Sequence, residues 1–195
     1  MKKQIILLVG LLFMSVVLKA QERDQGTIEI IPSIGYAVSF LNGDEIDGLG
    51  SRDAVQFGIT GDYYFSDRWS LRLGLSYFPM GAAIPRYELQ LDYLNIPINA
   101  NWHFGSHKNW NLNFGVAPGF LVKGSLNGEN VKASYDAFQL AISYGLGYKI
   151  ALSDNFSILL HSQGVFGVTN SIEDSDDFTR LNAGSSFNIG GVFTF

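Results

Sequence analysis

The feature that most constrains the fold is the alternation of side-chain character along residues 181–195. Positions counted back from Phe195 in steps of two are mostly apolar and end in Phe193 and Phe195, while the intervening positions are small and mostly polar. Successive side chains of a β-strand point to opposite faces, so the pattern predicts a strand with two unlike faces. The segment is longer than the ~9–11 residues that a strand needs to cross a bilayer.

The same alternation recurs along the chain. It predicts strands at 27–40, 54–65, 69–78, 93–104, 110–122, 138–150, 156–169 and 181–195. Long connections at 41–52, 80–91, 123–136 and 170–180 alternate with short turns. Short turns at one rim and long loops at the other are typical of transmembrane barrels. We therefore predict an all-β fold: an eight-stranded antiparallel up-and-down transmembrane β-barrel with both termini at the short-turn rim.

Two irregularities accompany this pattern. Leu89 and Leu91 are out of phase with the apolar positions that follow, which indicates a bulge near Asp92 or a strand that enters above the membrane. Four prolines fall within or at the ends of predicted strands, where each removes a ladder donor. They are Pro32, Pro79, Pro97 and Pro118.

Composition separates a membrane barrel from a secreted lipocalin-like barrel. A water-soluble barrel points its apolar face inward, so its outward face should carry many charges. Here charged residues make up 16% of the chain, against the usual ~25%. The polar face is built mainly from Gly, Ser, Asn, Gln and Ala, which suits the crowded interior of a small barrel. The chain has no Cys and hence no disulfide framework.

The N-terminus predicts export. Lys2 and Lys3 precede an apolar run at 5–18, and Ala20 offers a small residue for cleavage. This favours a signal peptide at 1–20, a polar leader at 21–26 and a barrel domain at 27–195. The alternative, an uncleaved anchor, is disfavoured because the run is shorter than the ~20 residues of a spanning helix. Cleavage removes three lysines and leaves the mature chain more acidic than the full sequence, whose net charge is −5; this argues against nucleic acid as a partner.

The aromatic residues sort toward the rims. The predicted topology places Trp69, Trp102 and Trp110 at the short-turn rim. Four further aromatic residues fall at the same rim: Phe104, Tyr148, Phe156 and Phe195. Belts of aromatic residues mark the membrane interfaces of bilayer-spanning barrels. We expect these seven residues to form one belt.

Four charged residues fall on the polar face, and therefore in the predicted lumen. They are Glu29, Asp62, Arg72 and Lys149. An eight-stranded barrel is just wide enough for side chains to fill, and isolated buried charges are costly. We expect a salt-bridge network that fills the interior; a polar pathway or gate is the alternative.

Other candidate sites are weaker. His103 and His161 also fall on the polar face, but their spacing matches no known metal-ligand set, so we expect hydrogen-bonded lumen residues. The acidic residues of the loop at 170–180 do not follow EF-hand spacing, and a solvated loop is expected. These acidic residues are Glu173, Asp174, Asp176 and Asp177. An enzyme would need Ser, His and an acid at the long-loop rim, and the long loops contain no His. We predict no enzyme, metal or cofactor.

Residues 92–97, Asp-Tyr-Leu-Asn-Ile-Pro, together with the terminal Phe195, resemble the PorT-like outer-membrane β-barrel domain proteins. More distantly, the chain is similar to the eight-stranded OmpA/OmpX-type barrels. The resemblance implies integration into the outer membrane, contact with its lipids and lipopolysaccharide, and recognition of Phe193 and Phe195 by the assembly machinery. Some relatives serve secretion. We therefore expect a structural or interaction barrel that binds an unknown protein through its long loops, in secretion or adhesion. The alternative is a narrow pore for small solutes or ions.

Overall fold

A computed structural model describes residues 24–43, 50–84, 86–172 and 179–195. The predicted signal peptide at 1–20 lies outside the described residues. The elements are β1 (Ile28–Gly43), β2 (Arg52–Tyr64), β3 (Trp69–Ile84), β4 (Tyr87–Asn95), β5 (Ile98–Phe104), β6 (Trp110–Leu126), β7 (Glu129–Asn130), the 3₁₀ turn η2 (Lys132–Ser134), β8 (Phe138–Ala151), β9 (Phe156–Gly167) and β10 (Arg180–Thr194). None of the described segments is a helix long and apolar enough to span a membrane.

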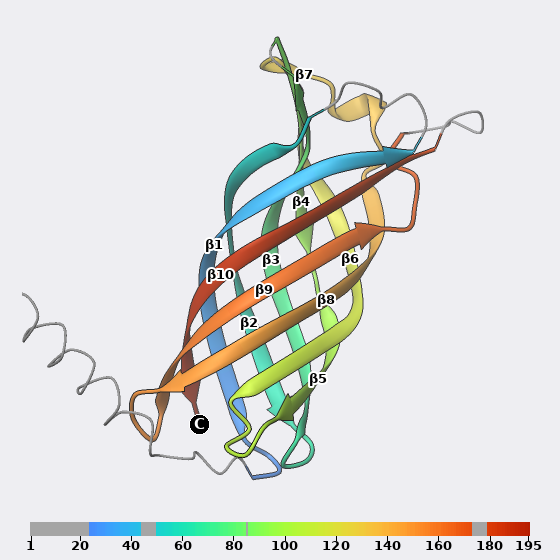
Figure 1. Cartoon of the computed structure of the whole chain (residues 1–195). Coiled ribbons are helices and arrows are strands. Elements are labelled where there is room, and N and C mark those ends of the chain that lie inside the picture. The colour runs from blue at the N-terminus through green and yellow to red at the C-terminus, as the bar shows by residue number, and fades with distance from the viewer. Residues whose placement is uncertain (1–23, 44–49, 85, 173–178) are drawn as a thin grey trace, which may run out of the picture.

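The strands close into an antiparallel barrel with eight strand positions around its wall, as the sequence pattern predicted. β4 and β5 follow each other in line and together occupy one strand position in the wall, between β3 and β6. β7 pairs only with the end of β6. β10 pairs with β1, which closes the ring (Figure 1). Residues 65–68, 105–109 and 152–155 make the short-turn rim, and the opposite end is the long-loop rim. In the described residues, ring closure pairs the first and last strands, so the main part of the wall has no open edge.

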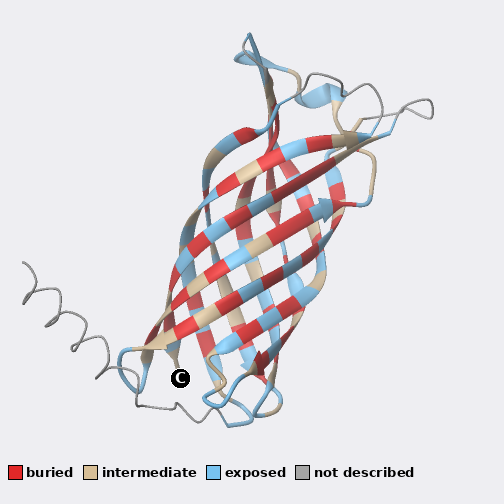
Figure 2. Cartoon of the chain, in the orientation of Figure 1, coloured by how far each residue is buried: buried red, intermediate tan, exposed pale blue. Residues whose placement is uncertain are grey.

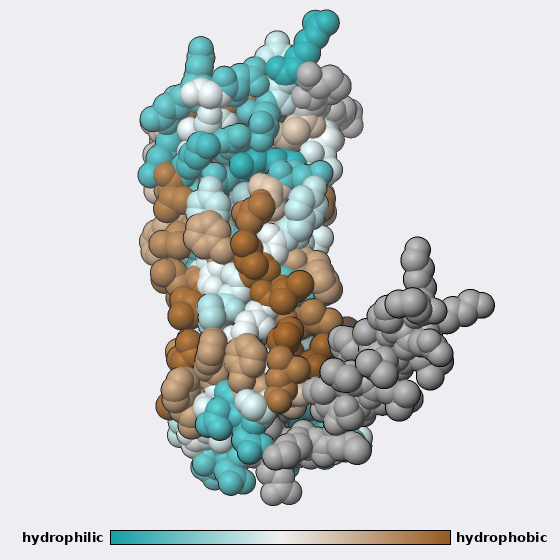
Figure 3. Space-filling view, turned by 90° about the vertical axis from the view of Figure 1, so that its left-hand side faces the viewer, coloured by the Kyte–Doolittle hydropathy of each residue, from teal (hydrophilic) through white to brown (hydrophobic). Residues whose placement is uncertain are grey.

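Burial alternates along most of the wall strands as the pattern predicts (Figure 2), although β4 and the end of β3 depart from it. In β10, for example, Asn188 and Gly190 are buried whereas Phe187 and Ile189 are exposed. The apolar residues thus face outward and the small polar residues face the lumen, the inverse of a water-soluble barrel. Figure 3 shows the outward residues as an apolar band on one face, with hydrophilic residues above and below it.

The structure corrects the prediction of a long connection at 80–91. β3 continues to Ile84 and β4 begins at Tyr87, so most of this segment is an antiparallel hairpin. β6 likewise continues to Leu126 and pairs with both β4 and β7. We call residues 81–90 and 123–130 together the arm; Figure 1 shows it standing above the long-loop rim. The bulge expected near Asp92 is confirmed, because the β4–β6 register shifts between Asp92 and Tyr93.

Each proline lies where the ladder on one side of its strand is interrupted, while the ladder on the other side of Pro32, Pro79 and Pro118 is continuous. The regular pairing of β1 with β10 skips Pro32, and Pro79 lies beyond Tyr77, the last β3 residue in the β2 ladder. Pro97 separates β4 from β5. On the neighbouring β6, the Pro118 carbonyl accepts a hydrogen bond from the Ile96 N–H at 2.8 Å. Pro118 has no N–H with which to donate a second bond to Ile96. The four prolines thus interrupt the ladders locally without ending the barrel.

Candidate functional site: a lumen closed in two layers

An ion pair between neighbouring strands begins the first layer, in the half of the lumen nearer the short turns. Asp62 of β2 and Arg72 of β3 stand opposite each other in register. Arg72 Nε donates to Asp62 Oδ1 at 2.7 Å and Nη2 donates to Oδ2 at 2.8 Å. Asn101 adds a third donor to Oδ2 at 3.0 Å. A bidentate guanidinium–carboxylate pair is among the strongest polar contacts available to side chains.

A second ion pair crosses the lumen. Lys149 of β8 donates Nζ to Glu29 Oε2 of β1, and also to the Tyr64 hydroxyl at 2.9 Å. Tyr64 in turn donates to Glu29 Oε2 at 3.1 Å. β9 and β10 lie between β8 and β1 in the wall, so this contact spans the interior rather than running along it. The lysine therefore ties opposite sides of the barrel together.

The two ion pairs form one cluster. Glu29 and Asp62 are directly opposite on β1 and β2, where two carboxylates repel. Lys149 Nζ lies 3.8 Å from Asp62 Oδ2 as well as bonding Glu29. All four charged side chains are at most 3% exposed. The structure thus brings together the four residues predicted for the lumen, with each carboxylate next to a cation, which offsets the cost of burial. We call them the ionic layer.

His103 lies at the edge of the ionic layer and not beside His161. Its Nε2 is 2.9 Å from the Ser70 hydroxyl, and its Nδ1 is 3.4 Å from the Tyr64 hydroxyl. A hydroxyl beside an imidazole is the first element of a nucleophilic site. Ser70, His103 and Tyr64 are all fully buried, however, so no substrate could reach this hydroxyl without opening the barrel.

His161 lines a small internal cavity above the ionic layer. Its Nε2 is 2.9 Å from Asn113 Nδ2, and the cavity has a volume of about 30 Å³. Gln56, Asn99 and Asn188 also line it, and each has a buried side-chain oxygen with no protein partner. A cavity of this size and polarity has room for water but not for a larger solute.

The second layer is apolar and lies nearer the long-loop rim. It is a cluster of fully buried side chains: Ala37, Phe78, Met80, Leu91, Tyr93, Ala117, Leu121, Ala141 and Val165. They come from six of the strands of the wall, so the cluster crosses the whole lumen. Two of its largest members, Phe78 of β3 and Tyr93 of β4, stand opposite each other in register. We call this cluster the apolar layer.

Arg52 joins the arm to the barrel wall, a role that sequence analysis missed. The regular β2–β3 ladder stops at Phe57 and Tyr77. Beyond this pair β2 and β3 separate, and the Arg52 side chain of β2 reaches across the gap to β3 and β4. Its Nη1 donates to the Met80 carbonyl and to Asp92 Oδ1, each at 2.6 Å, and its Nε donates to Glu88 Oε1 at 3.2 Å. In sequence it reads only as the last residue of a polar loop.

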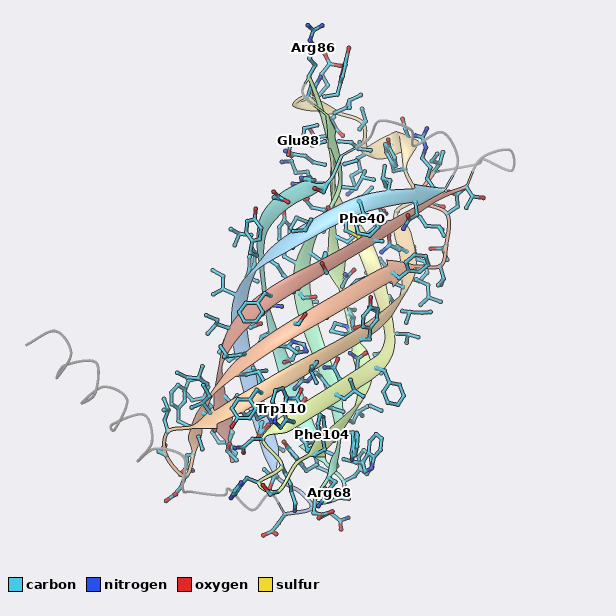
Figure 4. The ribbon with its side chains drawn as sticks, in the orientation of Figure 1. Phe40, Arg68, Arg86, Glu88, Phe104 and Trp110 are labelled. Carbon is cyan, nitrogen blue, oxygen red and sulfur yellow. The ribbon has the colours of Figure 1, made fainter. Side chains whose placement is uncertain are left out.

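Glu88 is half-exposed at the base of the arm (Figure 4). Hydrogen bonds from Gln90 and then from Arg52 hold the pKa of its carboxyl below the usual value, although partial burial opposes them. The carboxylate is therefore ionised at neutral pH and bonds Arg52.

The aromatic residues predicted for the short-turn belt lie close together. Rings of Trp69, Trp102, Phe104, Trp110 and Tyr148 follow one another at centroid distances of 6.3, 4.9, 6.2 and 4.8 Å. Figure 4 shows Phe104 and Trp110 at this end of the barrel.

The other predicted aromatic residues belong to the seam of the barrel. Phe156 packs on Phe193 at 5.1 Å. Phe195 is 78% exposed, and its backbone exchanges hydrogen bonds with Ile28 of β1. The chain terminus thus completes the ring, with both predicted assembly-signal side chains facing outward.

The predicted acidic loop residues Glu173, Asp174, Asp176 and Asp177 lie outside the described residues. Among the residues that the structure describes, no group of three or more His, Cys, Asp or Glu side chains is arranged to hold a metal ion. What remains as a site is the pair of layers across the lumen and the arm above them.

Comparison with known proteins agrees with this architecture. The sequence profile of the family named outer membrane protein beta-barrel domain matches residues 5–195. Neisserial surface protein A (NspA) is similar in structure, with a TM-score of 0.55 and 12% identity over 87% of this chain and 99% of that one.

Two proteins of Pseudomonas aeruginosa are also similar. The N-terminal β-barrel domain of OprF has a TM-score of 0.51 and 14% identity over 89% of this chain and 100% of its own. OprG has a TM-score of 0.51 and 15% identity over 90% of this chain and 98% of its own. At these identities the likeness shows the fold alone. No curated protein matches the sequence.

The narrower resemblance of residues 92–97 to the PorT-like group stays a prediction. The broader assignment rests on the profile match over nearly the whole chain and on the closed barrel. The chain belongs to the outer membrane protein β-barrel domain family and is located in the outer membrane.

Proposed function

We propose that this protein is a structural or interaction barrel whose lumen does not conduct, and that it binds a protein partner through its long-loop rim in secretion or adhesion. The observation that carries the proposal is the closure of the lumen by two unlike layers. Any solute would have to separate Lys149 from Glu29 and then displace Phe78 and its neighbours. We assign no catalytic role to the chain.

The arm supports a role in binding. In outer-membrane barrels the longer loops face outward from the cell, and the arm stands on that rim. Arg86 and Tyr87 are exposed near its tip, Tyr87 to 55%, and Leu126 is exposed on the neighbouring strand. Tyr and Arg are the residues that most often anchor protein interfaces.

Conductance of the refolded mature protein in a planar bilayer tests the closed lumen. A heat-modifiable gel shift first confirms that the barrel has folded. We expect a silent membrane. Steady channels whose conductance changes in Glu29→Ala or Arg72→Ala would overturn the proposal and make the protein a narrow pore.

Crosslinking from the long-loop rim tests the binding role. A photoreactive amino acid at Tyr87 should capture an envelope protein in intact cells, whereas one at Ser106, in a short turn at the opposite rim, should not capture the same protein. Capture of the same protein from both positions, or from neither, would contradict binding through the arm.

A further inference from the structure

The outward wall of the barrel carries an apolar groove. It runs across β10, β1, β2, β3 and β4 and has a volume of about 630 Å³. Its lining includes Ile34, Phe57, Leu75 and Ile189, and all four are substantially exposed, Ile34 to 60%. The groove is an open, shallow depression of the outward wall, lined almost entirely by apolar side chains.

The groove exists because two opposed positions lack bulk. Gly191 occupies an outward position of β10, between the exposed side chains of Ile189 and Phe193. By the register of β1 with β10 it stands across from Pro32, at the interruption of that ladder. A glycine and a proline here leave a hollow, whereas larger apolar side chains fill the outward positions on either side.

The walls of the groove are stacked aromatic rings and branched aliphatic side chains. Phe57 of β2 and Tyr77 of β3 stack at a centroid distance of 5.1 Å with an interplanar angle of 16°. They form one side, and Ile34 and Ile189, neighbours across β1 and β10, form another. Aromatic faces and branched aliphatic groups are a good contact surface for a methylene chain, because the gain depends on apolar area removed from water or loose lipid.

We infer that an acyl chain of an outer-membrane phospholipid occupies this groove as an ordered, site-bound lipid. The groove is continuous with the outward apolar surface, which the location of the protein places against lipid. A polar solute has almost no hydrogen-bonding partner on the lining, so the groove selects a hydrocarbon. A second copy of the protein is the competing occupant.

The position of the groove gives the lipid a structural role. Ser33 and Gly58 line both the outer groove and the internal cavity, so only this pair of backbone segments separates the two. The wall is also short of one ladder donor here, at Pro32. A bound acyl chain therefore covers the wall where the internal cavity lies directly behind it, across β1 and β2 and next to the β1–β10 seam.

Photolabelling tests the inference. The mature protein is refolded into vesicles of a phosphatidylethanolamine that carries a diazirine near the middle of one acyl chain. It is then irradiated and mapped by mass spectrometry. We expect adducts to concentrate on residues of the groove, Phe57 and Leu75 among them, above the outward residues of β8, Ile142 and Leu146.

Two glycine variants complete the experiment. In Gly191→Leu the three atoms nearest to a Cβ are ring atoms of Phe156 and Phe193, at 3.3–3.6 Å, and no backbone atom is among them, so the side chain can extend into the groove. In the matched control Gly61→Leu the nearest atoms to a Cβ are at 3.7 and 3.8 Å, at an outward position that does not line the groove. We expect Gly191→Leu to lose the excess labelling and Gly61→Leu to keep it.

Two results would overturn the inference. Labelling spread evenly around the barrel would mean that lipid contacts the groove as it contacts any other part of the wall. Protein–protein adducts at the groove that disappear in Gly191→Leu would show that a second copy occupies it. Because both variants must show the heat-modifiable shift, a folding failure is recognised separately.

Discussion

At the scale of single residues, the burial of charge decides how the lumen behaves. Asp62 and Arg72 satisfy each other in a bidentate pair, and Lys149 lies within 4 Å of both buried carboxylates. Removing one member of such a pair leaves the other charge unpaired and away from water, which costs more than removing both. The effect on stability of replacing one lumen charge therefore depends on which of the other three charges remain.

Arg72→Met tests this coupling. We expect it to lower the free energy of unfolding by roughly 3 kcal/mol, the low end of the usual range for a broken buried pair, because Asn101 and Lys149 still contact Asp62. The double variant Asp62→Leu/Arg72→Met should lose less than Arg72→Met alone. Urea unfolding in lipid vesicles gives both values. A single variant that is no less stable than the double would contradict the coupling.

At the scale of elements, the β3–β4 hairpin departs most from a regular barrel. Beyond Tyr77 it leaves the ladder with β2 and is joined to it by an isolated bridge between Gly50 and Ala83 and by the side chain of Arg52. With so few backbone bonds on its β2 side, the hairpin should open locally more readily than the rest of the wall. On that side it is held by the bridge, by Arg52 and by a hydrogen bond from Ser39 Oγ to the Gly81 carbonyl, while β4 pairs with β6 on the other side.

Arg52→Gln should therefore loosen the hairpin selectively. We expect faster amide hydrogen exchange in residues 80–91, with no change in β8 or β9, measured by mass spectrometry on the refolded protein. Lys108→Gln, which removes a cation at the opposite rim, is the control and should leave 80–91 unchanged. Equal exchange in the Arg52 variant and the native protein would show that the hairpin holds without this side chain.

The same hairpin should respond to acid. The pKa of Glu88 is lowered in the folded state by Gln90 and Arg52, so its contribution is fully present above the ordinary carboxyl pKa and is lost as the pH falls through the lowered value. After correction for intrinsic exchange rates, protection of 80–91 should decline below about pH 4, and less so in Glu88→Gln. An identical decline in both proteins would assign the effect to another group.

At the scale of the whole molecule, the two layers close the barrel in series. The ionic layer resists water and ions through paired charges, whereas the apolar layer excludes them through close packing. An ion crossing the lumen must pass both layers, so the layer that is harder to pass sets the conductance. Opening either layer alone should not make a channel.

Combined variants test the series arrangement. Phe78→Ala/Tyr93→Ala weakens the apolar layer, and Asp62→Ala/Arg72→Ala weakens the ionic layer. We expect both double variants to remain silent in planar bilayers and the quadruple variant to conduct, each after its heat-modifiable shift is verified. Steady conductance in either double variant would show that the other layer does not seal the lumen.

The sequence alone determined the architecture of the barrel, because the signal that carries it is local. The period of two assigns each residue to the inside or the outside, and this is sufficient to place Glu29 and Lys149 in the lumen. The order of long and short connections then sets the direction of each strand, which places Trp69 and Trp110 at one rim. The bulge near Asp92 is likewise visible in the sequence as a break in phase.

Tertiary structure decided which inward residues meet. Lys149 contacts Glu29 only because the closed ring brings β8 across from β1, and Arg52 reaches Asp92 only where β2 and β3 part. Residues 80–91 were mistaken for a loop because Gly81, two alanines and Pro85 break the alternation, although backbone pairing still makes a hairpin there. Periodicity reports the face of a strand; contacts across a lumen depend on ring closure and strand tilt, which no local pattern records.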